Sequence, residues 1–428
     1  MKRAIVVGSG AGGATVAKEL QGRFQVTVLE AGGAFRPCAL PLPAVEGIRK
    51  TGLLFDEREM SLVFPALQIR KTPEMVLVNG RGLGGTTTIC TGNALRMDQD
   101  LRALGIDLDA EFQEVYAEIP VTTVHQRRWR KPTRRLFEVC RELALDPQPT
   151  PKMGDYTRCV GCGRCVLGCP HGAKWDSRQF LHVAQERGAQ VIANCRAERV
   201  VMEDGRATGV IARRGLSRRF YPADLVVLAA GGFATPVILQ NSGIPCEPRL
   251  FVDPVLCVGI EYEGAAQQRE IEMPFVMQRP HYMLSPYFDY VSFLFNPAWR
   301  RPARDILALM IKLADSPAGA VLPQEIAKPL TDVDKRRLGE AVEECQEILR
   351  RFSGQPVQPF LGTINAGHPG GALPLTEQEA QSFHHRRLPG NLYVADATLL
   401  PQALGNPPIL TIIALAKRVS RLCAQMAA

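Results

Sequence analysis

Four cysteines lie close together near the middle of the chain: Cys159, Cys162, Cys165 and Cys169. Pro170 follows directly, so the run reads C-x2-C-x2-C-x3-C-P, a spacing that holds cubane iron–sulfur clusters. Gaps of two residues let successive thiolates converge on one cluster from a tight loop. Four thiolates also suit a structural zinc ion, but three short gaps followed by proline favour iron. The sequence therefore predicts a metal site, most simply a 4Fe-4S cluster, in a loop at 155–175.

The fourth ligand of this cluster is open on the sequence alone. In proteins with two such clusters the last cysteine of the run binds the other cluster, and only one run is present here. Either Cys169 folds back onto its own cluster, or a distant thiol completes the site. The distant candidates are Cys38, Cys90 and Cys140. Without a fourth thiolate the site would hold three irons.

A second group of residues with recognisable chemistry stands at the start of the chain. Gly8, Gly10 and Gly13 satisfy G-x-G-x-x-G, and Glu30 follows about twenty residues later. The first glycine permits a tight turn, the second lets the backbone approach a pyrophosphate, and the third lets the helix pack on its strand. A carboxylate at the end of the next strand accepts hydrogen bonds from ribose hydroxyls. FAD and NAD both fit this pattern.

The elements around these residues alternate between strands and helices. AIVV, the glycine turn, a helix and QVTVL form a βαβ unit within about thirty residues. We expect three short strands over 190–232, a helix over 334–352, a strand at NLYVADATLLP and a closing helix at TIIALAKRVSRLCAQM.

Composition limits the class of protein. The 428 residues are 46% hydrophobic and 22% charged, with a net charge of +8, which is an ordinary globular balance. No groove-reading or base-stacking motif supports nucleic-acid binding. We find no signal peptide and no transmembrane segment of about 18 apolar residues, so we expect a cytoplasmic protein. Clustered cysteines in a reducing compartment favour metal over disulfides.

Four further motifs decide between the two nucleotides: GRGLGGTTTICTG (80–92), AAGGFATPVILQNSGI (229–244), HPGGALPL (368–375) and NLYVADATLLPQALGNPPILTIIALAKRV (391–419). Together with the amino-terminal glycines they resemble the glucose–methanol–choline (GMC) oxidoreductase family. The segment CGRCVLGCPHGAKWDSRQFL after the first cysteine is similar to one in GMC steroid and long-chain alcohol oxidoreductases. The resemblance implies FAD as cofactor and an enzyme that oxidises a CH–OH group by hydride transfer to the flavin.

The same resemblance implies roles for single residues. Matched catalytic residues are His368, which would take the hydroxyl proton, and Asn406, which falls one position early in LGNPP. Cys90 stands where the family usually has asparagine. The matched cofactor-binding residues are Gly8, Gly10, Gly13, Glu30, Gly84, Gly85, Thr86, Val201 and Asp396.

The expected fold is α/β, with a discontinuous Rossmann-like FAD-binding domain and a substrate domain of antiparallel sheet plus helices. We assign 1–36, 72–100, 190–250 and 386–428 to the FAD-binding domain. The substrate domain takes 37–71, 101–189 and 251–385, including the cysteine loop.

The predicted function is an FAD-dependent dehydrogenase that passes electrons through the iron–sulfur cluster to an external one-electron carrier, such as a ferredoxin. The basic run RRWRKPTRR (127–135) could dock that carrier, or it could be a solvated helix end. The aromatic stretch 281–299 suits an apolar or aromatic alcohol, unless its rings only fill the core. Alternatives are an electron-transfer or bifurcating subunit of a larger complex, and a ferredoxin-driven reductase of an unsaturated or carbonyl substrate.

Overall fold

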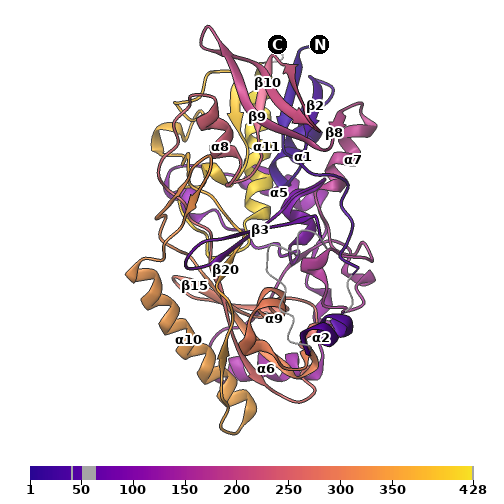
Figure 1. The fold of residues 1–428 in the computed structure, drawn as a ribbon, viewed down its shortest axis with the longest axis vertical. Helices are drawn as coiled ribbons and strands as arrows, with labels where there is room; N and C mark the ends of the chain where they lie inside the picture. The colour runs from indigo at the N-terminus through magenta and orange to yellow at the C-terminus, as the bar shows by residue number, and fades with distance from the viewer. Residues whose placement is uncertain (40–41, 51–63, 427–428) are drawn as a thin grey trace.

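The computed structural model describes residues 1–39, 42–50 and 64–426. One end of the elongated molecule holds a parallel sheet of five strands in the order β21-β12-β1-β2-β8. Both termini lie at this end (Figure 1). Its short apolar runs form strands because both faces of the sheet are covered, so no polar alternation is needed. The strands are β1 (Arg3–Val7), β2 (Gln25–Leu29), β8 (Gln190–Ile192), β12 (Leu225–Leu228) and β21 (Leu392–Val394).

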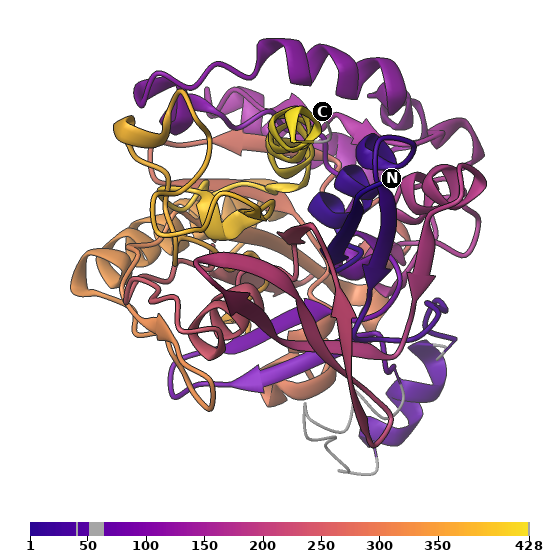
Figure 2. The ribbon, with the colours of Figure 1, turned by 90° about the horizontal axis from the view of Figure 1, so that it is seen from above.

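Helices and a second, antiparallel sheet cover the parallel sheet. Helix α1 packs between α11 and α7, and α11 also contacts α5; Figure 2 shows α1 and α11 side by side. The helices are α1 (Ala11–Leu20), α4 (Gln99–Ala103), α5 (Asp109–Glu118), α7 (Arg178–Glu186), α8 (Thr235–Asn241) and α11 (Ile409–Gln425). The antiparallel sheet is β9 (Cys195–Glu203), β10 (Arg206–Arg214) and β11 (Ser217–Pro222).

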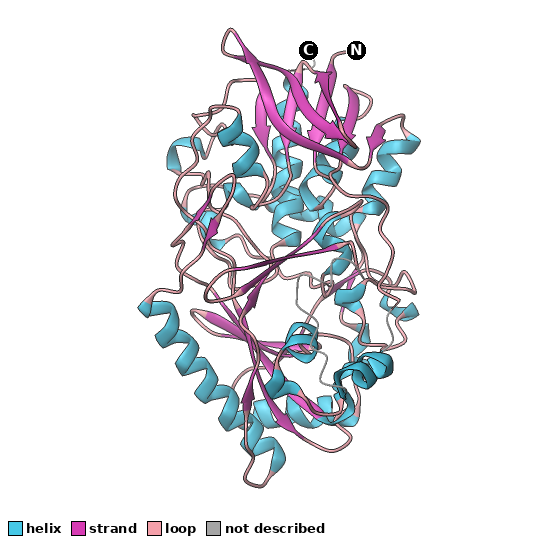
Figure 3. Ribbon diagram, in the orientation of Figure 1, coloured by secondary structure: helices cyan, strands magenta, loops and turns pink. Residues whose placement is uncertain are grey.

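The other end of the molecule is built on a mostly antiparallel sheet of nine strands in the order β3-β4-β20-β13-β16-β15-β14-β6, with β19 beside β13 (Figure 3). Its strands are β3 (Leu67–Lys71), β4 (Val76–Gly80), β6 (Gln148–Pro149), β13 (Val255–Glu261), β14 (Phe275–Gln278), β15 (Tyr282–Pro286), β16 (Ile306–Leu313), β19 (Phe360–Leu361) and β20 (Asn365–Ala366). Two small ribbons pair β5 (Val121–Thr122) with β7 (Lys152–Met153), and β17 (Ala320–Val321) with β18 (Ile326–Ala327).

The helices of this end are α2 (Leu42–Lys50), α6 (Lys131–Glu142), α9 (Tyr290–Phe295) and α10 (Asp332–Ser353). Helix α10 begins with a capping box between Thr331 and Asp334 and ends at Gly354 in the left-handed conformation. Its apolar face packs on β16 and β13. Together these layers confirm the predicted α/β class with parallel and antiparallel sheets.

The predicted domain boundaries stay a prediction, although some elements cut across them. Helices α5 and α7 belong to a predicted substrate segment, yet they contact α11 and α1 at the nucleotide end. Strand β4 belongs to a predicted FAD segment, yet it pairs with β3 and β20 in the nine-stranded sheet. Helices are needed to bury the outer face of the parallel sheet, whichever part of the chain supplies them. Residues 40–41 and 51–63 of the segment 37–71, and 427–428 of the segment 386–428, lie outside the described residues.

Across the ranges that the structure describes, every helix is too short or too polar to cross a lipid bilayer.

Candidate active site

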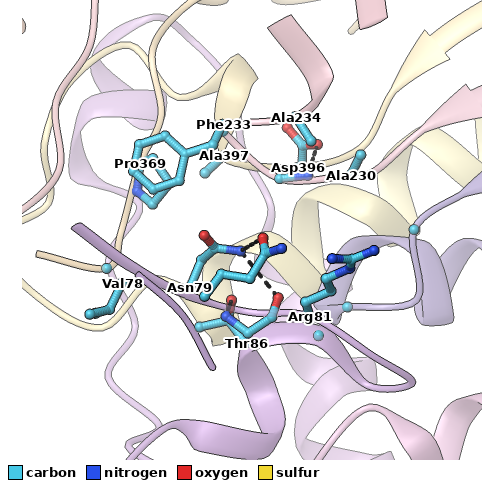
Figure 4. Close-up of a pocket in the computed structure, with 18 of the residues that line it drawn as sticks. Val78, Asn79, Arg81, Thr86, Ala230, Phe233, Ala234, Pro369, Asp396 and Ala397 are labelled. Carbon is cyan, nitrogen blue, oxygen red and sulfur yellow. Dashed lines mark hydrogen bonds between the residues drawn. The ribbon is translucent and has the colours of Figure 1, made fainter. Parts of the chain in front are cut away.

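A cavity of about 1620 Å³ lies between the two ends of the molecule. Residues from the β1–α1 turn, β4 and the loops after β12 and β21 line one part, and β13, β16 and β20 line another. Figure 4 shows Asn79, Arg81 and Thr86 on one wall, with Asp396, Ala230 and Phe233 facing them. The predicted site residues that line the cavity are Gly8, Gly10, Glu30, Gly85, Thr86, His368 and Asp396.

The three glycines of the first turn have three different surroundings. A Cβ on Gly8, whose φ is +97°, would lie 2.3 Å from the Ala229 carbonyl oxygen, and a Cβ on Gly13 would lie 2.0 Å from the Gly8 oxygen. A Cβ on Gly10 would meet no protein atom within 4 Å. Gly8 and Gly13 are therefore required by the packing of the turn itself. Gly10 leaves open space toward the cavity, as a backbone that must approach a phosphate requires.

Glu30 ends β2 at the edge of this turn. Its Oε2 accepts hydrogen bonds from the Ser9 N–H (3.1 Å) and hydroxyl (2.6 Å), and its Oε1 accepts from the Gly32 N–H (2.8 Å). Burial raises the pKa of Glu30, while these three donors lower it. The Glu30 carboxylate therefore stabilises the turn, and it also lines the cavity in which a ribose would bind.

The second glycine-rich loop closes against the first. The Ser9 hydroxyl accepts from the Gly84 N–H at 3.2 Å, and a Cβ on Gly85 would lie 3.0 Å from the Gly10 Cα. The buried Lys174 ammonium donates to three carbonyls in the following turn, those of residues 87, 88 and 90, at 2.8–3.0 Å. Gly84 itself lies behind the cavity wall, with a φ of +95° that favours glycine.

Asp396 is the acidic residue after the last parallel strand. Its Oδ2 accepts from the Gly231 N–H (2.8 Å) and the Thr235 hydroxyl (2.6 Å), and its Oδ1 accepts from the Thr398 N–H (2.9 Å). Burial raises the pKa of Asp396, and these hydrogen bonds oppose the rise. The carboxylate thus ties the glycine-rich loop after β12 to the loop after β21.

His368 lines the cavity from the loop after β20. Its Nδ1 lies 3.2 Å from Oδ2 of Asp253, which is 1% exposed and has a left-handed φ of +49°. Burial lowers the pKa of His368 well below its usual value, and the Lys312 charge lowers it further. Burial also raises the pKa of Asp253 to about 7. The imidazole is therefore neutral at physiological pH, which is the form that accepts a proton.

Asp253 also joins the two loops that carry the predicted catalytic residues, because its Oδ1 accepts from the Gly405 N–H at 2.9 Å. Neither Asp253 nor Lys312 was among the predicted site residues. No local pattern marks them: strand pairing brings Lys312 to the cavity, and Asp253 lies behind the lining in contact with His368.

Four of the predicted catalytic and cofactor-binding residues do not line the cavity: Gly13, Gly84, Asn406 and Val201. The Asn406 amide is 4% exposed and exchanges hydrogen bonds with Gln278, at 2.9 and 3.2 Å. Val201 lies on β9 outside the lining, whereas Ala197, four residues earlier on the same strand, is part of it. The adenine contact at Val201 therefore stays a prediction, and the part of β9 that lines the cavity is residues 196–199.

The cysteine loop forms a second, smaller cavity. All four cysteines of the run line it: Cys159, Cys162, Cys165 and Cys169. The Gly161 N–H points at the Cys159 sulfur at 3.5 Å. The buried Tyr156 ring also lines this cavity, and its hydroxyl has no hydrogen-bond partner. Even so, the part of the chain that the structure describes contains no group of three or more acidic, cysteine or histidine side chains arranged to hold a metal ion.

The three distant thiols lie away from the lining of this second cavity. Cys90 lines the large cavity instead, with its sulfur 3.1 Å from the Thr87 carbonyl oxygen. Cys140 is buried on α6. The Cys38 backbone N–H bonds to the Leu167 carbonyl at 2.8 Å, but the Cys38 side chain is not part of the lining.

A thin wall separates the two cavities. Cys165 lines the small cavity, and its neighbour Val166 lines the large one. The Val166 N–H donates to the Glu272 carboxylate at 3.0 Å, and the buried Lys152 ammonium donates to the Glu272 (2.6 Å) and Thr91 (3.2 Å) carbonyls. Thr91 in turn lines the large cavity. The wall is therefore a continuous hydrogen-bonded layer.

The aromatic stretch 281–299 contributes mainly to the core. Phe288, Phe293 and Trp299 are at most 1% exposed and belong to one hydrophobic cluster. Only Tyr287 of this stretch lines the large cavity. The structure thus favours packing as the role of these rings.

Comparison with known proteins defines the class. The family model for GMC oxidoreductase matches residues 3–260. An uncharacterized protein of Methanocaldococcus jannaschii is 28% identical over 97% of this chain and 98% of its own length. A long-chain-alcohol oxidase of Arabidopsis thaliana is 23% identical over 99% of this chain and 66% of its own length. The crystal structure of a pyridoxine 4-oxidase from Mesorbium loti superposes with a TM-score of 0.71 at 14% identity, covering 98% of this chain and 99% of that one.

The cavity, its two glycine loops and these similarities define a flavin-dependent oxidoreductase. The chain belongs to the GMC oxidoreductase family. This confirms the predicted enzyme class, an FAD-dependent oxidoreductase that acts on CH–OH groups.

Proposed function

We propose that the protein is a dehydrogenase that oxidises an apolar alcohol and passes the electrons through an iron–sulfur cluster to an external carrier. The observation that supports the first part best is the position of a neutral histidine, His368, in the same cavity as both glycine-rich loops. The residues present fit FAD, because Gly10 leaves the turn open toward the cavity. Bound there, FAD would accept a hydride from the alcohol carbon.

The chain's own residues handle the proton of the alcohol. Since Nδ1 of His368 faces Asp253, Nε2 is the ring nitrogen that takes the hydroxyl proton. Asp253 fixes the ring orientation and favours the imidazolium once it forms. Glu30 and Asp396 hold the cavity loops between which the nucleotide would bind.

The lining near His368 indicates the kind of alcohol. Val255 and Met310 line this part of the cavity from β13 and β16, and Ile89 and Met273 come from neighbouring loops. These side chains are aliphatic or thioether groups that would cover a hydrocarbon. An apolar aliphatic alcohol is therefore a better candidate than an aromatic one, and the named activity of the Arabidopsis relative agrees with that choice.

The cysteine loop fits a 4Fe-4S cluster in its ligand set and spacing. Four thiols line one cavity, a backbone N–H already points at one sulfur, and the glycines between them have φ values of +63° to +90°. Such a cluster would transfer electrons one at a time. The four-thiol lining favours Cys169 as the fourth ligand over Cys38, Cys90 and Cys140.

An acidic carrier such as a ferredoxin would dock where the cluster is nearest to solvent. Val160, beside Cys159, is 63% exposed, and basic residues lie close to it along the chain and through one contact. Arg128, from the predicted basic run, donates to the Thr157 carbonyl at 2.7 Å and to that of Cys159. Arg158 is also exposed. A positive rim of this kind speeds the encounter with a negatively charged protein.

Metal and flavin analysis of anaerobically purified protein tests both cofactors together. We expect about four irons and one FAD per chain. Cys169→Ser should lower the iron content, whereas Cys38→Ser, which changes a buried thiol outside the lining, should not. Zinc in place of iron would refute the electron route, and a protein without FAD would refute the proposed chemistry.

Anaerobic titration with alcohols then tests the direction of the reaction. Long-chain alcohols should bleach the flavin of the parent enzyme, and His368→Ala should slow this by about 10²–10⁴-fold. If His368→Ala bleaches as fast as the parent, an electron-transfer or bifurcating role becomes the better explanation. If only reduced ferredoxin bleaches the flavin, the protein is a reductase of an unsaturated or carbonyl substrate.

A further inference from the structure

Six lysines of the described chain are buried, and the ammonium groups of five of them have a carboxylate partner or at least three hydrogen-bond acceptors. Lys18 and Lys417 form ion pairs with Glu19 and Glu118. Lys328 is paired with Asp315 at 2.7 Å and also donates to three carbonyls. Lys152 and Lys174 each donate to at least three oxygens. This is the usual condition for a buried ammonium, because desolvating an unpaired charge is costly.

Lys312 is the exception. Its side chain on β16 is 4% exposed, and its ammonium has one hydrogen-bond acceptor in the structure, the Asp253 carbonyl at 3.3 Å. No carboxylate of the described chain lies within ion-pair distance of it. An ammonium has three donors, so at least two of them are left without a protein acceptor.

The unsatisfied ammonium lines the large cavity next to the proposed base. The register of the sheet places Lys312 beside Val255 on β13, and Val255 beside Asn365 on β20. All three line the cavity with His368. Asp253 connects the two basic groups, since its carboxylate faces His368 and its carbonyl accepts from Lys312. The Lys312 side chain therefore lies beside the space that a substrate and flavin would fill.

We propose that Lys312 is a catalytic residue that binds the oxygen on which negative charge develops during alcohol oxidation. The assignment rests on the proposed function for the identity of the reaction. When His368 takes the hydroxyl proton, negative charge collects on the alcohol oxygen, and as hydride leaves the carbon the charge moves to the flavin ring. A fixed ammonium in a dry cavity stabilises either site strongly. In this role the Lys312 ammonium would take the place of the Asn406 amide, which is hydrogen-bonded to Gln278.

Two sets of measurements distinguish whether Lys312 stabilises the negative charge on the substrate oxygen or on the flavin. For the substrate arm, we measure the dissociation constant of a long-chain fatty acid, whose carboxylate imitates an alkoxide, in the FAD-loaded protein. For the flavin arm, we measure the dissociation constant of sulfite, which adds to oxidised flavin, and the flavin midpoint potential. The variants are Lys312→Met and Lys312→Gln, and Ile311→Val, at a buried position on the same strand outside the cavity lining, is the matched control.

Both lysine variants should weaken the binding of the fatty acid, of sulfite, or of both by at least tenfold, and Ile311→Val should change neither affinity by more than twofold. In the parent protein, burial lowers the pKa of Lys312 to about 8, so the affected affinity should fall as the pH rises above that value. Unchanged binding of both anions in a folded lysine variant would overturn the assignment. If neither lysine variant folds, the parent protein still tests the assignment. An affinity for both anions that does not fall above about pH 8 would overturn it as well. These binding readouts need no turnover, so they stand apart from a failure of the protein to oxidise alcohols.

Discussion

The turn at Gly10 allows a sharp test of cofactor binding, because the protein itself does not need a glycine there. The residue caps α1 with φ −71° and ψ −162°, an extended conformation that alanine adopts freely. A Cβ at Gly10 would meet no protein atom within 4 Å. Alanine loses a few tenths of a kcal/mol as a helix cap and regains about 0.4–1 kcal/mol from reduced unfolded-chain entropy. Gly10→Ala should therefore leave the stability of the cofactor-free protein unchanged within about 0.5 kcal/mol.

FAD binding should respond very differently. The added methyl group would occupy the space where the pyrophosphate must approach the turn. We expect an affinity loss of at least a hundredfold, which is about 2.7 kcal/mol. The assay has two parts: denaturant unfolding of the cofactor-free variant, and fluorescence titration of that protein with FAD. Gly390→Ala, at an exposed position that is also free of neighbours, is the neutral control.

Gly12→Ala provides the opposite case. Its Cβ would lie 1.7 Å from the Ala395 carbonyl oxygen, which is backbone that cannot turn aside. This variant should lose stability even without cofactor. If Gly10→Ala binds FAD as tightly as the parent, the nucleotide does not approach the chain at this turn, and the placement of the cofactor is wrong. If Gly10→Ala unfolds like Gly12→Ala, the space beside Gly10 is not open as described.

Three further predictions concern buried polar groups. Asp253→Asn keeps the shape beside His368 but removes the carboxylate, and should slow alcohol-driven flavin reduction about 10- to 100-fold without weakening FAD binding, as stopped-flow and titration would show. Lys328→Met leaves Asp315 as an unpaired buried charge and should lower the unfolding free energy by about 3–5 kcal/mol, measured by urea denaturation; a loss below 1 kcal/mol would contradict the pairing. Burial lowers the pKa of His125 to about 4, so the unfolded state takes up the proton first, and the unfolding free energy should fall by about 3 kcal/mol between pH 6.5 and 4. His125→Gln should flatten that part of the pH profile, and an unchanged slope would assign it to other groups.

The sequence predicted the nucleotide end well because its contacts are local. Gly8, Gly10 and Glu30 lie in one βαβ unit, so their spacing alone places them around one turn. The helix expected at 334–352 is also local, and the structure extends it by two residues at the start and one at the end. Where sequence neighbours determine the geometry, pattern and capping residues are sufficient.

The surroundings of His368 could not be predicted from the sequence in the same way. Lys312 reaches the cavity only through its register with Val255, and Asp253 meets His368 only through a contact across 115 positions. The Asn406 amide is hydrogen-bonded to Gln278, 128 positions away, and does not line the cavity. The pairing of β9 with β10 is irregular between Ala197 and Arg199, and a period-2 pattern does not reveal such a bulge. Long-range pairing decides such positions, and a single sequence does not contain it.

The wall between the cavities bears on the proposed electron route. If the cysteine run holds the proposed cluster, electrons from the large cavity would need to cross only the layer between Val166 and Cys165 to reach it. The two cavities share no lining residue. The alcohol and the carrier would therefore meet the protein at separate places and need not exclude each other. It follows that an acidic carrier bound near Arg128 should leave the apparent affinity for the alcohol unchanged; competition between them would show that both use the large cavity.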